Sequence, residues 1–288
     1  MSTDRTHDSR EVVLVRNIQG REFLEIDHPA VKARISLQGA HIVSCIPTGQ
    51  KPLLWMSPTD PEQPGKPLRG GIPICWPWFA GERQGPAHGI ARTSQWVLSD
   101  SNSTPQEIRL SFELPESVIA EQLPGEKWAL RVSFVLGATL SVSLSTTNLG
   151  PQPQPLSQAL HSYLPVSDIR AVRVSGLEGA QYIDQVEGTS SNIQEGEVRF
   201  TGEVDRIYHG HSAPVMLKDS EDQIIVSRDG SQSVVVWNPW IDKGGRLSQF
   251  PAEGYLEMLC IEAANAGPDG RILKPGETHT LSTEIRHA

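Results

Sequence analysis

The chain is dominated by short segments in which apolar and polar residues alternate, and this pattern constrains its fold more than any other feature. The clearest is TLSVSLSTTN at 139–148, where Leu and Val fall on one face and Ser and Thr on the other. Because successive side chains of a strand point to opposite faces, a period of two is typical of a strand buried on one side. We therefore expect a protein built from half-buried β-strands.

Many further segments carry β-type patterns, and turn residues separate them. They lie at residues 11–17, 21–27, 33–37, 96–100, 108–114, 129–137, 171–177, 223–230, 233–239, 255–264 and 278–286. The first two flank Gly20 and predict a hairpin. Helical patterns are confined to 116–123 and 205–208, and strands do not alternate with helices as in a Rossmann or TIM architecture. So many strands in 288 residues predict an all-β fold, a large antiparallel sandwich or barrel with few short helices.

The Pro-rich stretch GPQPQPLSQ at 150–158 is a candidate linker between domains. Strand patterns look alike on both sides of it, so we interpret it as a rigid extended crossover. This interpretation predicts a single β-sandwich domain over 1–288, with residues 1–10 flexible. A second irregular stretch, 57–71, is rich in Pro and Gly. Long ordered loops on a β scaffold often carry functional sites.

Charge and composition narrow the range of partners. Asp and Glu outnumber Lys and Arg by 34 to 25, for a formal net charge of -9, which argues against nucleic acid because phosphate backbones recruit basic faces. A small phosphorylated ligand needs only a few well-placed arginines. No apolar run approaches the roughly 20 residues of a membrane helix, and the polar N-terminus does not resemble a signal peptide. We expect a cytoplasmic protein without a membrane partner and, since no heptad repeat is present, a monomer.

Three cysteines, Cys45, Cys75 and Cys260, are odd in number and form no CxxC pair. We interpret them as reduced residues of the core, with a reactive thiol at Cys75 as the alternative. No metal site is expected, because His209 and His211 have the spacing of metal ligands but lack a further ligand.

Four segments interrupt the strand pattern with residues that are costly to bury without a purpose. They are LRGGIPICWPWFAG (68–81), PAHGIARTSQW (86–96), QALHSYLPVSD (158–168) and YLEMLCIEAANAG (255–267). In the first, Trp78 and Phe79 follow Arg69, and this combination suits a sugar with an anionic group. Aromatic rings stack on the C–H surface of a sugar, and guanidinium groups bind oxyanions. The alternative is a rigid core plug of Pro and Trp.

The other three segments each contain a titratable candidate. His88 and Arg92 flank a Gly in a loop that is either a binding turn or simply solvated. His161 lies among apolar residues, where a hydrogen-bonded core histidine is the alternative to a catalytic one. Glu262 follows the apolar run MLCI, and a carboxylate near the end of a buried strand is costly unless it is paired or used. Trp237 ends a strongly apolar strand and forms either a site wall or a lid.

Taken in order, RGGIPICWPWFA, HGIAR, QALHSYL, EVDRIY, VVVWNPW and CIEAANA resemble the glucose-6-phosphate 1-epimerases, or hexose-phosphate mutarotases, of the aldose 1-epimerase group. The resemblance spans roughly residues 11–286. It implies the galactose-mutarotase-like β-supersandwich. It also implies an enzyme that interconverts the α and β anomers of a hexose 6-phosphate, with glucose 6-phosphate as the expected substrate and no cofactor or metal.

The resemblance further implies roles for individual residues. The family's catalytic histidine and glutamate fall on His161 and Glu262. Its phosphate-binding and sugar-binding positions fall on Arg69, His88, Arg92 and Asp205, and the expected stacking wall consists of Trp78, Phe79 and Trp237. The chain departs from the family at Ala87, because a Gln often precedes motifs of the HGFAR type. This departure leaves the finer sugar preference undetermined.

Three alternatives remain open on the sequence alone. The first is a mutarotase for free hexoses, and the second is a non-catalytic carbohydrate-binding or sugar-sensing protein. The third is a lyase or a glycosidase, in which Asp205 and Glu262 would supply the two carboxylates that glycoside hydrolysis usually needs.

Overall fold

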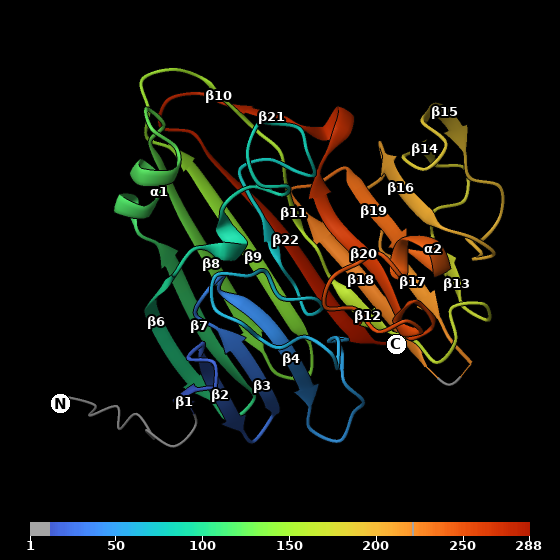
Figure 1. The fold of residues 1–288 in the computed structure, drawn as a ribbon, viewed down its shortest axis with the longest axis horizontal. Helices are drawn as coiled ribbons and strands as arrows, with labels where there is room; N and C mark the ends of the chain where they lie inside the picture. Colours follow the sequence, from blue (N-terminus) through green and yellow to red (C-terminus); the bar gives the residue numbers. More distant parts are fainter. Residues whose placement is uncertain (1–11, 221) are drawn as a thin grey trace.

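The computed structural model describes residues 12–220 and 222–288, and antiparallel sheets account for most of its regular structure (Figure 1). The all-β fold with few short helices is therefore confirmed. The helices are α1 (Glu116–Gln122) and α2 (Trp240–Gly244), with 3-10 turns η1 (Ala91–Thr93), η2 (Gly254–Leu256) and η3 (Gly267–Asp269). The expected flexibility of residues 1–10 concerns a segment outside the described residues.

Two smaller sheets contain the predicted N-terminal hairpin and the crossover segment. The four-stranded sheet has the order β1 (Val12–Arg16), β2 (Glu22–His28), β3 (Val31–Ser36) and β4 (His41–Pro47). The two-stranded sheet pairs β10 (Gln154–Leu156) with β21 (Arg271–Leu273). Strand β10 lies in the Pro-rich stretch, which is extended as expected and leads directly into β11 (Gln158–Leu160).

Two eight-stranded sheets make up the rest of the molecule. The first, called the β9 sheet, has the order β13 (Arg173–Ser175), β17 (Val215–Lys218), β18 (Gln223–Asp229), β22 (Thr278–His287), β9 (Leu140–Asn148), β8 (Trp128–Leu136), β7 (Glu107–Leu114) and β6 (Val97–Thr104). The second, called the β20 sheet, has the order β15 (Thr189–Ile193), β14 (Gln181–Asp184), β16 (Val204–His209), β19 (Ser233–Asn238), β20 (Met258–Asn265), β11 and β5 (Ile74–Cys75), and β12 (Tyr163–Pro165) also pairs with β20.

One sequence-based prediction is wrong: residues 205–208 are not helical. They lie inside β16, which pairs with β14 on one side and β19 on the other. The buried residues Val204 and Tyr208 point to the apolar core, whereas Asp205 points to the opposite face. Backbone pairing on both edges of β16 thus overrides the weak local preference for a helix. The helix that contacts this strand is α2, through Lys243 and Asp205.

Alternation gives the β20 sheet two different faces, and one of them packs in the main core. That core joins Val234, Val236, Leu259, Ile261 and Ala263 of this sheet to Leu130, Phe134 and Leu144 of the β9 sheet. The opposite face carries a separate apolar cluster that includes Cys260, Trp237 and Tyr163. Because this second face is not needed to pack the main core, it is available for a site.

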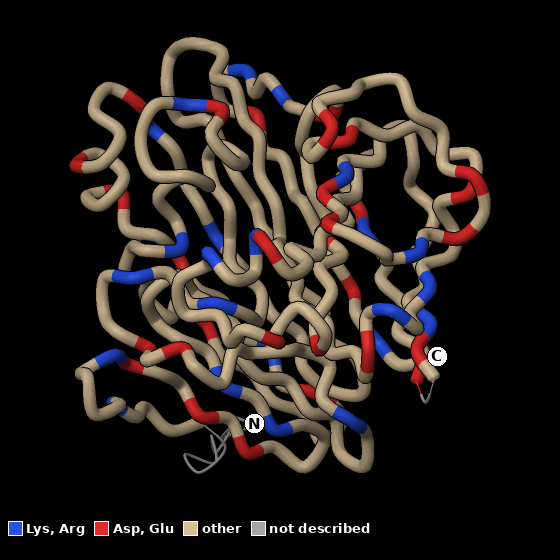
Figure 2. Tube along the Cα trace, turned by 45° about the vertical axis from the view of Figure 1, so that its right-hand side comes forward, with Lys and Arg blue, Asp and Glu red and all other residues tan. Residues whose placement is uncertain are grey.

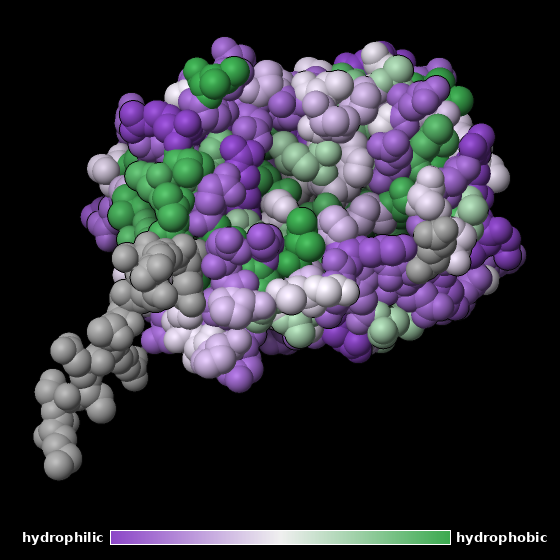
Figure 3. Space-filling model, turned by 90° about the horizontal axis from the view of Figure 1, so that it is seen from below, coloured by the Kyte–Doolittle hydropathy of each residue, from purple (hydrophilic) through white to green (hydrophobic). Residues whose placement is uncertain are grey.

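The surface is polar and mixed in charge. In the view of Figure 2, acidic and basic residues are interspersed along the chain, as expected for an excess of only nine acidic groups. The face seen in Figure 3 is largely hydrophilic, and apolar surface is confined to small patches. Among the described residues, no helix combines the length and the apolar character that crossing a bilayer would require.

The main core offers a direct test of the sandwich. Phe134 is 1% exposed and its ring lies edge-on to Phe112, with centroids 5.8 Å apart. We expect Phe134→Ala to lower the free energy of unfolding by about 3–5 kcal/mol, because it leaves a cavity in a close-packed interior. Urea denaturation measures this loss. Ile272→Ala is the control, since Ile272 is 70% exposed. A similar loss in both variants would contradict the assigned core.

Candidate active site

The second face of the β20 sheet forms the floor of a cavity of about 530 Å³, a volume typical of small-molecule sites. The floor contributes His161, Tyr163, Asp205, Val235, Trp237 and Glu262. The walls, which come from loops and α2, contribute Leu68, Arg69, Phe79, Ala87, His88, Arg92, Gln185, Lys243 and Leu247. All the residues predicted from the sequence, apart from Trp78, therefore line one cavity.

Strand register explains how residues distant in sequence meet on this floor. One row across β16, β19, β20 and β12 consists of Asp205, Trp237, Cys260 and Tyr163. The next row contains Ile207, Val235 and Glu262. Since residues paired across a sheet point to the same face, both rows face the cavity side together.

His161 completes the second row. Leu160, the residue before it, pairs with Ala263, and β12 resumes the same register on β20 beyond Ser162. His161 therefore lies opposite Glu262, and its Nε2 is 3.3 Å from Glu262 Oε1. The geometry of this pair thus follows from backbone pairing and not from the loops.

The buried pair favours the neutral forms of both groups. Glu262 is 1% exposed and His161 is 9% exposed. Burial raises the pKa of Glu262 well above its ordinary value and lowers the pKa of His161 well below its own, because desolvation penalises charge. Glu262 Oε2 and His161 Nδ1 have no hydrogen-bond partner among the described residues. Both groups therefore retain capacity for a ligand.

Charge divides the cavity into two ends. Besides burial, the negative charge of Asp205 raises the pKa of Glu262. Besides burial, neighbouring basic side chains, Arg69 and Arg92 among them, lower the pKa of His161. The geometry agrees: Asp205 lies on β16, on the Glu262 side of the floor, whereas Arg69 donates to the Tyr163 hydroxyl and Tyr163 stacks on His161. The carboxyl side of the pair is therefore the acidic end of the cavity, and the imidazole side is the basic one.

The loop that carries His88 depends on a left-handed turn. His88 and Gly89 have φ values of 65° and 71°. A Cβ on Gly89 would lie 1.9 Å from the carbonyl oxygen of Trp76, so only glycine fits there. The Ala80 N–H donates to His88 Nδ1 at 3.2 Å, which puts the proton of the neutral ring on Nε2. Burial is the main cause that lowers the pKa of His88 to about 3, so His88 is a neutral hydrogen-bond donor.

Arg92 closes the same loop. Its Nη2 donates to the carbonyl oxygen of Ala87 at 2.7 Å. Ala87 itself lines the cavity at the position where the family resemblance predicts a Gln. The side chain of a Gln is therefore absent from this wall, while the backbone of the same residue holds the guanidinium.

A hydrogen bond fixes the backbone of Arg69, whereas most of the donors of its guanidinium group make no hydrogen bond with the described residues. Its N–H donates to Asp60 Oδ2 at 2.7 Å, and its Nη1 donates to the Tyr163 hydroxyl at 3.3 Å. Its buried Nε has no partner among the described residues. The remaining donors of this side chain suit an oxyanion in the cavity.

Lys243 of α2 brings a further cation to the acidic end. Its Nζ lies 2.8 Å from Glu203 Oε1 and 3.3 Å from Asp205 Oδ2. Burial is the main cause that raises the pKa of Asp205, and the lysine opposes this rise. Lys243 follows Trp237 by six residues in the sequence, and nothing in that spacing assigns it this contact.

Two other lining residues escaped sequence reasoning. Tyr163 stacks on His161, with ring centroids 4.9 Å apart. Its position two residues after His161 is a signal that both side chains share a face of the strand. Gln185 follows β14 and carries no comparable signal. Its N–H donates to the Asp205 carbonyl oxygen at 2.8 Å, so only the tertiary fold brings it to the cavity.

The aromatic wall expected from the sequence forms only in part. Phe79 and Trp237 line the cavity, whereas Trp78 does not. Trp78 belongs to the main core, where its Nε1 donates to the Pro86 carbonyl oxygen at 3.0 Å and Arg83 lies over its ring. Trp78 lies in a bend after β5 and its ring packs in the main core, so of the two adjacent aromatic residues only Phe79 faces the cavity.

The donor atoms of His161, Cys260 and Glu262 lie within 4.8 Å of one another, so this trio has the residue types of a metal site. Burial raises the pKa of the Cys260 thiol well above its ordinary value. All three cysteines are unpaired and buried, as the sequence indicates, and burial also raises the pKa of Cys75, which opposes a reactive thiol there.

The burial of Glu262 predicts a pH-dependent gain in stability when its charge is removed. A carboxyl group with a raised pKa costs stability as the pH rises above its unfolded value of about 4.3. We expect Glu262→Gln to increase the free energy of unfolding at pH 7 by at least ~1 kcal/mol, and this gain to vanish near pH 4. Urea denaturation from pH 4 to 8 measures it. Glu284→Gln is the control, because Glu284 is a half-exposed residue of β22 outside the cavity. A gain independent of pH would contradict the assignment.

Comparisons with known proteins identify the family of the chain. The sequence model described as "Aldose 1-epimerase" matches residues 22–286. The chain is 33% identical to the "Putative glucose-6-phosphate 1-epimerase" of Escherichia coli, over 95% of this chain and 92% of that one. It is 32% identical to the protein of the same name from Cenchrus ciliaris, over 85% and 78%. A crystal structure titled as a "putative mutarotase" from Salmonella typhimurium superposes with a TM-score of 0.86 at 31% identity, covering 96% of this chain and 97% of that one. The chain therefore belongs to the aldose 1-epimerase family.

Proposed function

We propose that this protein interconverts the α and β anomers of a hexose 6-phosphate, with glucose 6-phosphate as the expected substrate and Glu262 and His161 as the acid–base pair. One observation carries the proposal. His161 and Glu262 oppose each other at 3.3 Å on the floor of a cavity whose imidazole end is lined by two arginines. The names of the relatives also support a phosphorylated substrate.

The proposed reaction needs one base and one acid that exchange roles. The reactive state is the ion pair of the Glu262 carboxylate and the protonated His161 imidazole, which a proton transfer across their 3.3 Å contact forms from the neutral pair. In that state Glu262 takes the proton of the C1 hydroxyl while His161 gives a proton to O5, and the C1–O5 bond breaks. The open-chain aldehyde then turns about C1–C2. O5 attacks the other face of the carbonyl, and each proton returns to the group that supplied it. The balance closes without a cofactor, so an imidazole and a carboxylate are sufficient.

The orientation of the substrate follows from the two ends of the cavity. In a hexopyranose 6-phosphate, O5 is bonded to C5, and C5 carries the phosphorylated C6. The phosphate therefore belongs on the side of the group that protonates O5. In this cavity His161 is on the side of Arg69 and Arg92, whereas Glu262 is on the side of Asp205. This arrangement favours His161 as the partner of O5 and Glu262 as the partner of the C1 hydroxyl.

The phosphate also has an electrostatic role in this scheme. In the empty cavity, burial and the neighbouring arginines lower the pKa of His161. A bound dianion offsets the positive charge of those arginines, which favours the protonated imidazole that the reaction needs. The phosphate thus contributes to catalysis as well as to binding.

The pairing of Glu262 favours a mutarotase over a glycosidase. Hydrolysis of a glycosidic bond usually uses two carboxyl groups around the scissile bond. Here Glu262 faces an imidazole, and the second carboxylate, Asp205, is paired with Lys243. We accordingly assign Asp205 to a substrate hydroxyl. Release of reducing sugar from a glycoside would contradict this assignment.

The reaction is tested by magnetisation-exchange NMR on the two anomers of glucose 6-phosphate. We expect the wild-type protein to accelerate exchange, and Glu262→Gln to lower that rate by about 100-fold or more while the protein stays folded, because the general base is lost. Glu284→Gln is the matched surface control. Wild-type protein that leaves the uncatalysed exchange rate unchanged would refute the function.

The phosphate contact is tested by Arg69→Ala. Charge-assisted hydrogen bonds contribute about 1.5–3 kcal/mol, so we expect KM for glucose 6-phosphate to rise by about 10-fold or more and kcat to fall less. Turnover of glucose should be poor and nearly unchanged by this substitution. Arg109→Ala is the control, because Arg109 is an exposed residue of β7 outside the cavity. Equal KM values for glucose 6-phosphate in the wild type and Arg69→Ala would exclude the phosphate clamp.

A further inference from the structure

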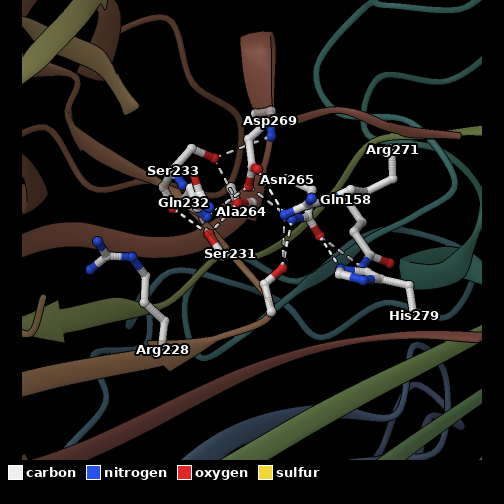
Figure 4. A network of polar contacts seen from close by, with 12 residues as sticks. Gln158, Arg228, Ser231, Gln232, Ser233, Ala264, Asn265, Asp269, Arg271 and His279 are labelled. Carbon is white, nitrogen blue, oxygen red and sulfur yellow. Dashed lines mark hydrogen bonds and ion pairs between the residues drawn. The ribbon is translucent and has the colours of Figure 1, made fainter. Parts of the chain in front are cut away.

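We infer that Asn265 is a positioning residue for the acid–base pair: its side-chain amide locks the register of β11 on β20 and thereby holds His161 opposite Glu262. The register argument concerns this fold alone, whereas its consequence for catalysis rests on the proposed function. Figure 4 shows Asn265 within a network of polar contacts behind the cavity floor.

The amide of Asn265 uses its full hydrogen-bonding capacity. Its Oδ1 accepts from Gln158 Nε2 at 3.1 Å and from the ring of His279 at 3.0 Å. Its Nδ2 donates to the Gly230 carbonyl oxygen and to Asp269 Oδ2, each at 2.9 Å. Asn265 is 0% exposed. Four partners from four different segments therefore fix this side chain in one orientation.

The network continues to both sides of Asn265. Gln158 accepts through Oε1 from the Thr146 hydroxyl at 3.2 Å, and that hydroxyl accepts from Trp76 Nε1 at 3.1 Å. On the other side, Asp269 accepts from the Gln232 N–H at 2.9 Å and pairs with Arg271 at 2.8 Å. The end of β20 is thus tied to β9, β22 and the segments that flank β19 and β21.

The network lies on the same pair of strands, β11 and β20, that positions His161 and Glu262. Gln158 and Asn265 are Cα partners in the ladder of β11 on β20. His161 follows Gln158 by three residues, and Glu262 precedes Asn265 by three residues. A slip of one residue would turn one member of the reactive pair to the opposite face of the sheet. The hydrogen bond between the two amides excludes that slip.

Apolar packing cannot perform the same task at this position. Strand β11 has only three residues. On β20 its other ladder contacts join Ala159 to Ala264 and Leu160 to Ala263, and on its other edge the same two residues pair with Cys75 and Ile74 of the two-residue strand β5. Small alanine side chains offer few contacts that distinguish one register from the next. A buried amide pair does distinguish them, because a wrong register leaves polar groups without partners in an apolar interior. Register specification is the best-attested use of such buried polar groups.

The test compares Asn265→Ala with Asn148→Ala. Asn148 is also 0% exposed, and its Nδ2 donates to the carbonyl oxygens of Gln152 and Leu273, each at 2.8 Å. Both variants lose buried hydrogen bonds, so both should lower Tm. Only Asn265→Ala should lower kcat for glucose 6-phosphate, by about 10-fold or more. Its KM should stay within about twofold, since the arginine loops are untouched.

A second readout does not depend on activity. The imidazole resonances of His161 and their titration, followed by NMR, should change in Asn265→Ala and remain as in the wild type in Asn148→Ala. If the wild type does not accelerate anomer exchange but this spectral difference is present, the positioning role stands and the proposed function fails. Unchanged His161 resonances in Asn265→Ala, whatever the rates, would overturn the positioning role.

Gln158→Leu keeps the inference testable if Asn265→Ala does not fold. This variant removes the same cross-strand hydrogen bond from the other partner and leaves Asn265 with its three other contacts. We expect the same direction of change in kcat and in the His161 resonances, with a smaller amplitude. A folded Gln158→Leu variant that matches the wild type in both readouts would refute the inference.

Discussion

Backbone pairing along Met258–Asn265 is the constraint on which the rest of the site depends. Strand β20 pairs with β19 on one side and with β11 and β12 on the other. These ladders put Glu262, Val235 and His161 in one row on one face. Because alternation in a strand is strict, the same ladders send Ile261 and Ala263 into the main core. The register of β20 therefore determines both which residues pack in the apolar core and which residues form the proposed reactive pair.

Local patterns were sufficient for most of the fold. The alternation in TLSVSLSTTN is local, and it matches β9 almost residue for residue. The prediction failed at 205–208, where pairing on two edges outweighs the local preference, and it failed to separate Trp78 from Phe79. The first error involves ladder partners that are distant in sequence, and a single sequence does not reveal such partners. Trp78 instead contacts Arg83 and Pro86, which are close in sequence, but no local pattern indicates which of two adjacent aromatic rings turns into the core.

The sequence predicts which residues form the site, but it does not predict how they lie relative to one another. All the site residues that the family resemblance implies line the cavity, apart from Trp78, which does not. The resemblance did not assign a role to Tyr163, Gln185 or Lys243, which line the cavity as well. Nothing near His161 in the sequence indicates that it lies opposite Glu262, because that contact arises from the register of non-neighbouring strands. The division of charge between the two ends of the cavity likewise emerges only when loops and strands are assembled.

The floor and the walls of the cavity have different structural origins, and this has a consequence for how such a protein can diverge. The proposed reactive pair sits on a sheet whose register is tied to the core, so its geometry cannot change without rebuilding the fold. Arg69, His88 and Arg92 lie outside the sheet, and hydrogen bonds to or from the loop backbone hold these segments in place. Mutation can therefore reshape recognition of the sugar and its substituents while the chemistry is inherited intact. We propose that Ala87, where the family resemblance predicts a Gln, is a wall position of this kind.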